Sequence, residues 1–129
     1  MKQQEIVRNQ KGFTLVEIIT VLIILSVLAA IAVLQYIDLE QNAQQKVFDG
    51  ATVELNGWEG LVEANLKMSA TGYQDDAQLM LVVDYNLGTD YDWQAGHPVT
   101  VGGDLTFRGQ TVTLNRTPSD ASKPASWNR

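Results

Sequence analysis

Hydrophobic side chains fill residues 12–34 of this chain almost without interruption. From residue 13 onward only Thr14, Glu17, Thr20 and Ser26 break the apolar run. A helix over residues 13–34 rises roughly 33 Å, about the thickness of the hydrocarbon core of a bilayer. The pattern therefore predicts a helix that can cross a membrane.

Apolar residues continue beyond this run, but they now recur every three or four positions with polar residues between them. This spacing is typical of an amphipathic helix. Gly50, Gly57 and Gly60 fall inside the pattern, and each lowers helix stability by roughly 1 kcal/mol. We expect one long helix that ends between Ser69 and Gly72. Its apolar stripe comprises Tyr36, Leu39, Ala43, Val47, Ala51, Leu55, Trp58, Val62 and Leu66.

The segment that follows the helix has two interpretations. Asp75 or Asp76 can cap a short helix that stops at Gly88. Alternating apolar residues between positions 79 and 87 would equally suit a strand. We favour the short helix.

The C-terminal part predicts a small antiparallel meander. Its strands would be residues 98–101, 104–108 and 110–115, divided by glycines. We expect the polar tail after residue 116 to be loose unless Trp127 packs against the head. The apolar side of the meander should cover the outward half of the long helix with Val99, Val101, Leu105, Phe107, Val112 and Leu114.

Composition limits the chemistry of the chain. Its 129 residues contain no cysteine, which excludes a disulfide framework, a thiol nucleophile and a zinc-thiolate site. The net charge is −6, and because residues 1–12 carry +2, the remainder carries −8. This acidic balance argues against nucleic acid as a partner. The basic residues before the apolar helix predict a cytoplasmic N-terminus and an exported C-terminal part.

Glu17 is the one charged residue in the apolar run. A carboxylate in hydrocarbon is costly unless it is paired, and no cationic side chain lies in the run to pair with it. Glu17 therefore needs a partner from outside residues 13–34.

The N-terminal residues resemble the class III signal sequence of type IV pilins and pseudopilins. A short basic leader ends in Lys11-Gly12, and Phe13-Thr14-Leu15-Val16-Glu17 and an unbroken apolar helix follow. The resemblance implies that a prepilin peptidase cuts between Gly12 and Phe13, that Phe13 is then N-methylated, and that Glu17 guides assembly.

Physical reasoning gives Glu17 the same role. Cleavage before Phe13 frees an amine that is mostly protonated at neutral pH. The amine of a staggered neighbouring subunit could lie at the same membrane depth as Glu17 and pair with it. This ion pair would stabilise one axial register between subunits. Assembly would depend on cleavage, because the uncleaved leader holds that nitrogen in a peptide bond.

Two residues of the anchor depart from the family. Pilins commonly have a proline where this chain has Leu34, and often a glycine where it has Ser26. Leucine restores the backbone donor that proline lacks and removes its steric clash. We expect residues 26–34 to stay helical and the filament to extend less.

Other candidate sites are few. Asp84, Asn86, Asp90 and Asp92 could offer oxygen ligands to Ca²⁺, but a solvated acidic loop is the interpretation we favour because the glycine and closing glutamate of an EF-hand are missing. No nucleophile elbow or phosphate loop is present, so we expect no enzyme and no cofactor.

The sequence thus predicts an α+β, pilin-like fold with four regions. Residues 1–12 are the leader, 13–34 the transmembrane and filament-core helix, 35–72 its amphipathic continuation, and 73–129 a small globular head. The expected function is that of a structural subunit of a type IV pilus-like filament, held in the cytoplasmic membrane as precursor and then displayed on the cell surface. Its partners would be its own copies, a prepilin peptidase and an assembly machine. A type II secretion pseudopilin and an uncleaved membrane-anchored binding module remain the alternatives.

Overall fold

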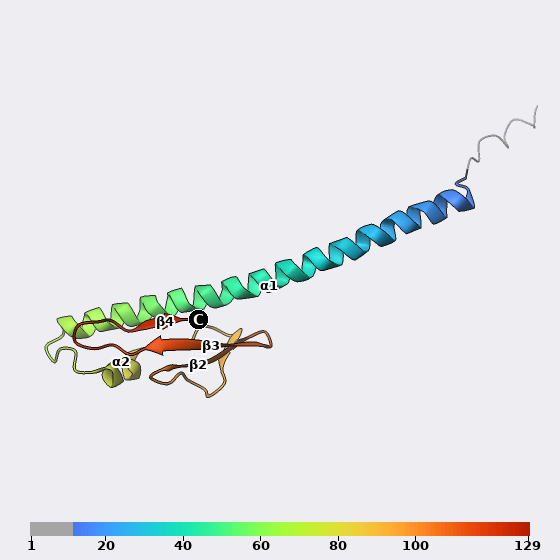
Figure 1. Ribbon diagram of the computed structural model, residues 1–129. Coiled ribbons are helices and arrows are strands. Elements are labelled where there is room, and N and C mark those ends of the chain that lie inside the picture. Colours follow the sequence, from blue (N-terminus) through green and yellow to red (C-terminus); the bar gives the residue numbers. More distant parts are fainter. Residues whose placement is uncertain (1–11) are drawn as a thin grey trace, which may run out of the picture. The chain divides into compact units, whose positions relative to one another are not determined.

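The computed structural model describes residues 12–129 (Figure 1). The chain divides into two compact units, Met1–Asn42 and Ala43–Arg129, which are described separately. The leader expected at residues 1–12 lies, except for Gly12, outside the described residues.

Helix α1 spans Leu15–Met68 and enters both units. In the first unit the side chains of residues 15–42 are all exposed, and this stretch is long and apolar enough to cross a membrane. Its hydroxyl groups bond within the helix: Thr20 Oγ1 donates to Val16 O at 2.8 Å and Ser26 Oγ donates to Leu22 O at 2.6 Å. Internal satisfaction of polar groups is what a lipid environment demands.

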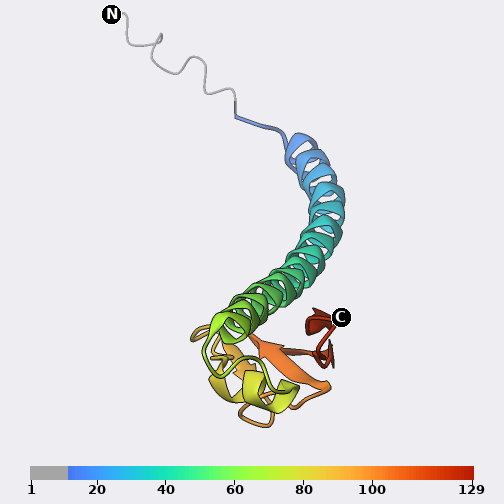
Figure 2. The ribbon, with the colours of Figure 1, turned by 90° about the vertical axis from the view of Figure 1, so that its left-hand side faces the viewer.

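The second unit combines the end of α1 with a short helix and one sheet. Helix α2 spans Asp76–Val82, and the strands are β1 (Tyr91–Trp93), β2 (Gly102–Phe107), β3 (Gln110–Thr117) and β4 (Ser126–Asn128). They form an antiparallel meander in the order β1-β2-β3-β4. The sheet lies beside the green part of α1 in Figure 1 and Figure 2. The predicted α+β arrangement is confirmed.

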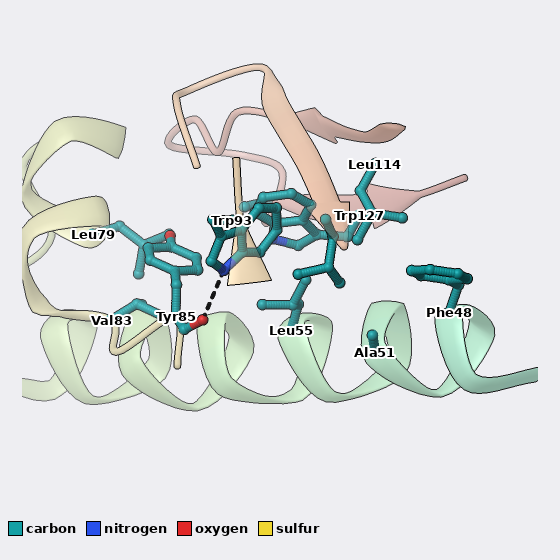
Figure 3. Close-up of a cluster of buried hydrophobic side chains, with 11 residues drawn as sticks. Phe48, Ala51, Leu55, Leu79, Val83, Tyr85, Trp93, Leu114 and Trp127 are labelled. Atoms are coloured by element: carbon teal, nitrogen blue, oxygen red, sulfur yellow. Dashed lines mark hydrogen bonds between the residues drawn. The ribbon is translucent and has the colours of Figure 1, made fainter. Parts of the chain in front are cut away.

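The core of this unit lies between α1 and the sheet (Figure 3). Phe48, Ala51 and Leu55 project from α1 at a helical spacing and are at most 1% exposed. Leu105 of β2 and Leu114 of β3 lie on the inward face of the sheet and are fully buried. Trp93 Nε1 donates to Tyr85 O at 2.9 Å, so the indole enters the core with its polar atom satisfied.

The short helix follows the predicted cap but not the predicted end. Asp75 is the N-cap, and its carboxylate accepts a hydrogen bond from Gln78 N at 2.8 Å. The helix ends at Val82 rather than at Gly88, because Asp84 and Asn86 bond the backbone two residues ahead and turn the chain.

The prediction of a strand at residues 98–101 is wrong. Val99 forms only an isolated bridge with Gly102, and Val99 and Val101 are 52% and 66% exposed. Gly102 belongs to β2 and adopts a φ of 125°. A Cβ there would lie 2.0 Å from Leu114 O, so only glycine lets the chain pass so close to β3.

The two outer strands were not predicted. The edge strand β1 has only three residues, and β4 arises in the tail. Trp127 of β4 is 4% exposed and packs in the core. Asn56 of α1 holds its backbone, because Asn56 Nδ2 donates to Trp127 O at 3.0 Å and Trp127 N donates to Asn56 Oδ1 at 2.7 Å. The tail is therefore docked rather than loose, because Trp127 packs against the head.

Candidate assembly site

The start of α1 is closed by a reciprocal pair of hydrogen bonds between Thr14 and Glu17. Thr14 N donates to Glu17 Oε2 at 2.6 Å, and Glu17 N donates to Thr14 Oγ1 at 3.2 Å. This arrangement is a capping box, which satisfies two backbone donors that a helix start leaves open. Glu17 thus already has a partner within its own chain.

Sequence reasoning missed this partner because it looked only for a cationic side chain. The signal was available, since a threonine followed three residues later by a glutamate is the sequence signature of a capping box. The carboxylate at a helix N-terminus is also favoured by the partial positive charge there.

Gly12 and Phe13 precede the helix and are exposed, Phe13 by 83%. The peptide bond between them therefore lies outside the hydrogen-bonded helix. A backbone in this state is open to a protease without prior unfolding of α1. The amine that cleavage would free belongs to the residue directly before Thr14.

A second group of charged residues, which sequence reasoning did not find, lies buried in the head. Arg116 of β3 is fully buried and is the hub of this group. Its Nε donates to Glu59 Oε1 of α1 at 2.8 Å, and Nη1 and Nη2 each donate to one oxygen of Asp76 of α2 at 2.7 Å. Nη1 also donates to Thr100 O at 2.9 Å. One guanidinium thus joins both helices, the sheet and the turn before β2.

Neighbouring side chains complete the group. Tyr85 OH donates to Glu59 Oε1 at 2.6 Å, and Ser119 donates to Asp76 Oδ1 through both its backbone nitrogen and its hydroxyl. Burial and the hydrogen bond to Glu59 raise the pKa of Tyr85. Burial alone would raise the pKa of Asp76, but the hydrogen bonds from Arg116 and Ser119 outweigh it and lower this pKa. The pKa of Arg116 is raised, because its bonds to Asp76 and Glu59 outweigh burial.

The four calcium candidates do not converge as a cage. Asp84 and Asn86 use side-chain oxygens to accept backbone hydrogen bonds, and Asp90 lies 3.6 Å from Arg108 Nη2. Asp92 is on β1. Among residues 12–129 no group of three or more His, Cys, Asp or Glu side chains is placed to hold a metal ion.

The comparisons with known proteins agree with the geometry of the N-terminus. An α+β protein with a long apolar N-terminal helix and a small antiparallel sheet has the pilin-like arrangement. Residues 7–33 match the family model described as "Prokaryotic N-terminal methylation motif". The chain therefore carries the class III signal of type IV pilins and pseudopilins, which supports its membership of that family and confirms the resemblance. No curated protein and no solved structure gives a significant match to the chain.

Proposed function

We propose that the chain is a structural subunit of a type IV pilus-like filament, cleaved between Gly12 and Phe13 and polymerised through α1. The observation that carries the proposal is the start of α1, where an exposed Gly12-Phe13 bond directly precedes a capped helix inside a matched methylation motif. The exposed apolar surface of residues 15–42 supports the same proposal, because it has no covering partner within the described chain.

The precursor is anchored in the cytoplasmic membrane by α1 with its basic N-terminus in the cytoplasm. A prepilin peptidase removes residues 1–12, and Phe13 is then methylated. The freed cation of one subunit pairs with Glu17 of its neighbour, and this pair fixes the axial register. The contact between subunits is head-to-tail and does not close, so the copies build an open filament. An assembly machine drives their addition.

Glu17 then exchanges one partner for another. In the single chain it accepts a hydrogen bond from Thr14 N, a neutral donor. A charged amine forms a stronger hydrogen bond with a carboxylate than a neutral amide does. The capping box therefore keeps Glu17 satisfied in the membrane, and the neighbour's amine supplies the additional stabilisation that favours assembly.

The intact mass of protein sheared from the cell surface tests this function. A surface species that begins at methylated Phe13 is the expected result. A full-length species confined to the membrane would refute it and favour an uncleaved binding module. Cleaved protein that forms only short periplasmic assemblies would instead assign the chain to the pseudopilins of type II secretion.

A further inference from the structure

The two edges of the sheet differ in what the chain places beside them. Strand β4 forms one edge, and there the side-chain amide of Asn56 bonds both the oxygen and the nitrogen of Trp127. The amide thus occupies the position that a further strand would take. Strand β1 forms the other edge. An open edge strand can add an extended peptide through main-chain hydrogen bonds.

The pairing with β2 determines which backbone groups of β1 point outward. Gln94 N, directly after β1, donates to Asp104 O of β2 at 3.0 Å. Backbone groups along a strand alternate between its two edges, so Asp92, two residues before Gln94, also turns its groups toward β2. Tyr91 and Trp93 therefore direct their N–H and C=O groups away from β2.

One acceptor and one donor on this outer edge have no hydrogen-bond partner within residues 12–129. Tyr91 N donates to Gly88 O at 3.3 Å. Trp93 O accepts from Gly96 N at 2.8 Å. Tyr91 O and Trp93 N remain. A parallel strand offers both complementary groups on one residue, whose N–H would donate to Tyr91 O and whose C=O would accept from Trp93 N. That residue would lie opposite Asp92.

All three residues of β1 line a groove of about 840 Å³. One wall is α2, where Leu81 is 88% exposed, and another is the turn before β2, where Val99 is 52% exposed. The volume lies in the range of well-formed binding sites. The groove therefore has room for a short extended segment beside β1, with apolar side chains on both walls to contact it.

The groove is also acidic. Asp84 and Asp92 line it, and neither forms a salt bridge within residues 12–129. Among the described residues that line the groove, none is lysine or arginine. Arg108, which follows β2, lies 3.6 Å from Asp90 and does not line the groove. The charge of the groove is therefore complementary to a cationic partner.

We propose that β1 binds an extended segment of another protein as a parallel strand, with a basic residue opposite Asp92 and an apolar residue on each side of it. Residues directly opposite in a sheet share a face, so the basic side chain meets the carboxylate of Asp92. The two apolar neighbours lie on the other face, beside the side chains of Tyr91 and Trp93. The groove belongs to one head, residues 43–129, so the inference goes beyond the proposed function and does not depend on polymerisation.

A second copy of the chain fits this requirement poorly. Within strands β1–β4 the one basic residue is Arg116, which has polar neighbours on both sides and is buried. Lys67 does lie between two apolar residues, but it belongs to α1 and is not extended. The partner is therefore a different protein.

Binding of short peptides to the full chain in an uncharged detergent tests the proposal. The probe is the peptide Ser-Val-Lys-Val-Ser, blocked at its C-terminus and labelled with fluorescein at its N-terminus, and the readout is fluorescence anisotropy. In one version the lysine is N-methylated, and in the matched control the valine after it. Only the N–H of the central residue faces β1 in a parallel strand, because the N–H of the next residue points away. We expect the first change to weaken binding about tenfold and the second to leave it nearly unchanged.

Charge reversal tests the register. Asp92→Lys should weaken binding of the lysine peptide about fivefold and strengthen binding of a peptide with glutamate at the centre. The control Glu40→Lys changes the net charge equally at an exposed residue of the first unit, and should alter neither affinity. Absence of saturable binding to the wild-type chain would overturn the proposal, and so would an equal loss for the two N-methylated peptides. Equal weakening by both charge variants would also overturn it, because general attraction to an acidic chain would then suffice.

Discussion

Removal of the buried Arg116 guanidinium should strongly destabilise the head. The variant Arg116→Met keeps a side chain of similar reach but deletes all four hydrogen bonds that the guanidinium donates to Glu59, Asp76 and Thr100. Asp76 would keep its two bonds from Ser119, but Glu59 is fully buried and would keep only the hydroxyl of Tyr85. Leaving one member of a buried ion pair alone typically costs about 3–5 kcal/mol.

That cost is large beside the whole stability of a small domain, about 5–15 kcal/mol. The assay is denaturant unfolding of the full chain in detergent, followed by tryptophan fluorescence. Trp93 and Trp127 are 7% and 4% exposed, so their emission reports the core directly. The midpoint for Arg116→Met should fall sharply while the slope of the transition stays the same.

Two further variants make the reasoning refutable. Arg108→Met is the matched control, because Arg108 is 71% exposed and its nitrogen lies 3.6 Å from Asp90, so the loss should stay below about 1 kcal/mol. The double variant with Glu59→Leu and Arg116→Met removes both charges of the Glu59–Arg116 pair and should be more stable than Arg116→Met alone, since Asp76 keeps its bonds from Ser119 in both variants. Equal midpoints for Arg116→Met and Arg108→Met would refute the assignment of Arg116 as the hub.

Three other predictions concern the tail, the pH dependence and the anchor. Asn56→Ala should release β4, because it removes the two bonds to Trp127 at a cost of about 1–3 kcal/mol. Limited proteolysis should then cut within residues 118–129 faster than it does in Asn65→Ala, which is the control because Asn65 is exposed. The pKa of Asp76 is lower in the folded head than in the unfolded chain. The stability that Asp76 contributes should therefore be complete above about pH 4 and should be lost as the pH falls through the folded pKa. Asp76→Asn should flatten this part of the curve of stability against pH. Residues 26–34 lie within continuous α1, so their amides should exchange slowly with solvent in filaments. Leu34→Pro should speed this exchange just before residue 34. Unchanged rates would contradict the role given to Leu34.

The long helix could be predicted from sequence because its signal is local and repeated over many turns. Ala51 and Leu55 of the predicted stripe are buried as expected. Tyr36 and Leu39, which belong to the first unit, are exposed at 70% and 67%. The buried face of α1 in the second unit also includes Glu59, which no hydrophobic pattern would select.

The buried charges escaped prediction because their partners are far apart in sequence. Glu59 and Arg116 are 57 residues apart, and each alone is an ordinary surface residue type. The edge strands were not predicted from the sequence for a related reason. Strand β4 has three residues and forms because Asn56 and the core receive Trp127, which is a tertiary cause without a local pattern.

The N-terminal site was different, since its residues were all named from the sequence and only the bond between Thr14 and Glu17 was missed. Residues in one turn of helix have positions that the sequence dictates. The missed bond changes how the assembly role of Glu17 must be tested, because Glu17→Ala removes the cap and the charge together.

The most direct test of the account is the assembly of Glu17→Gln compared with Glu17→Ala and the wild type. Glutamine can also serve in a capping box, so Glu17→Gln keeps the cap of α1 and loses only the charge. The measurement is the amount of protein that begins at Phe13 in sheared surface material relative to the membrane fraction. We expect both variants to be cleaved and retained in the membrane with little in the sheared fraction. Sheared Glu17→Gln protein at the wild-type level would show that the cap alone is needed, and would contradict the charge pair as the basis of the register.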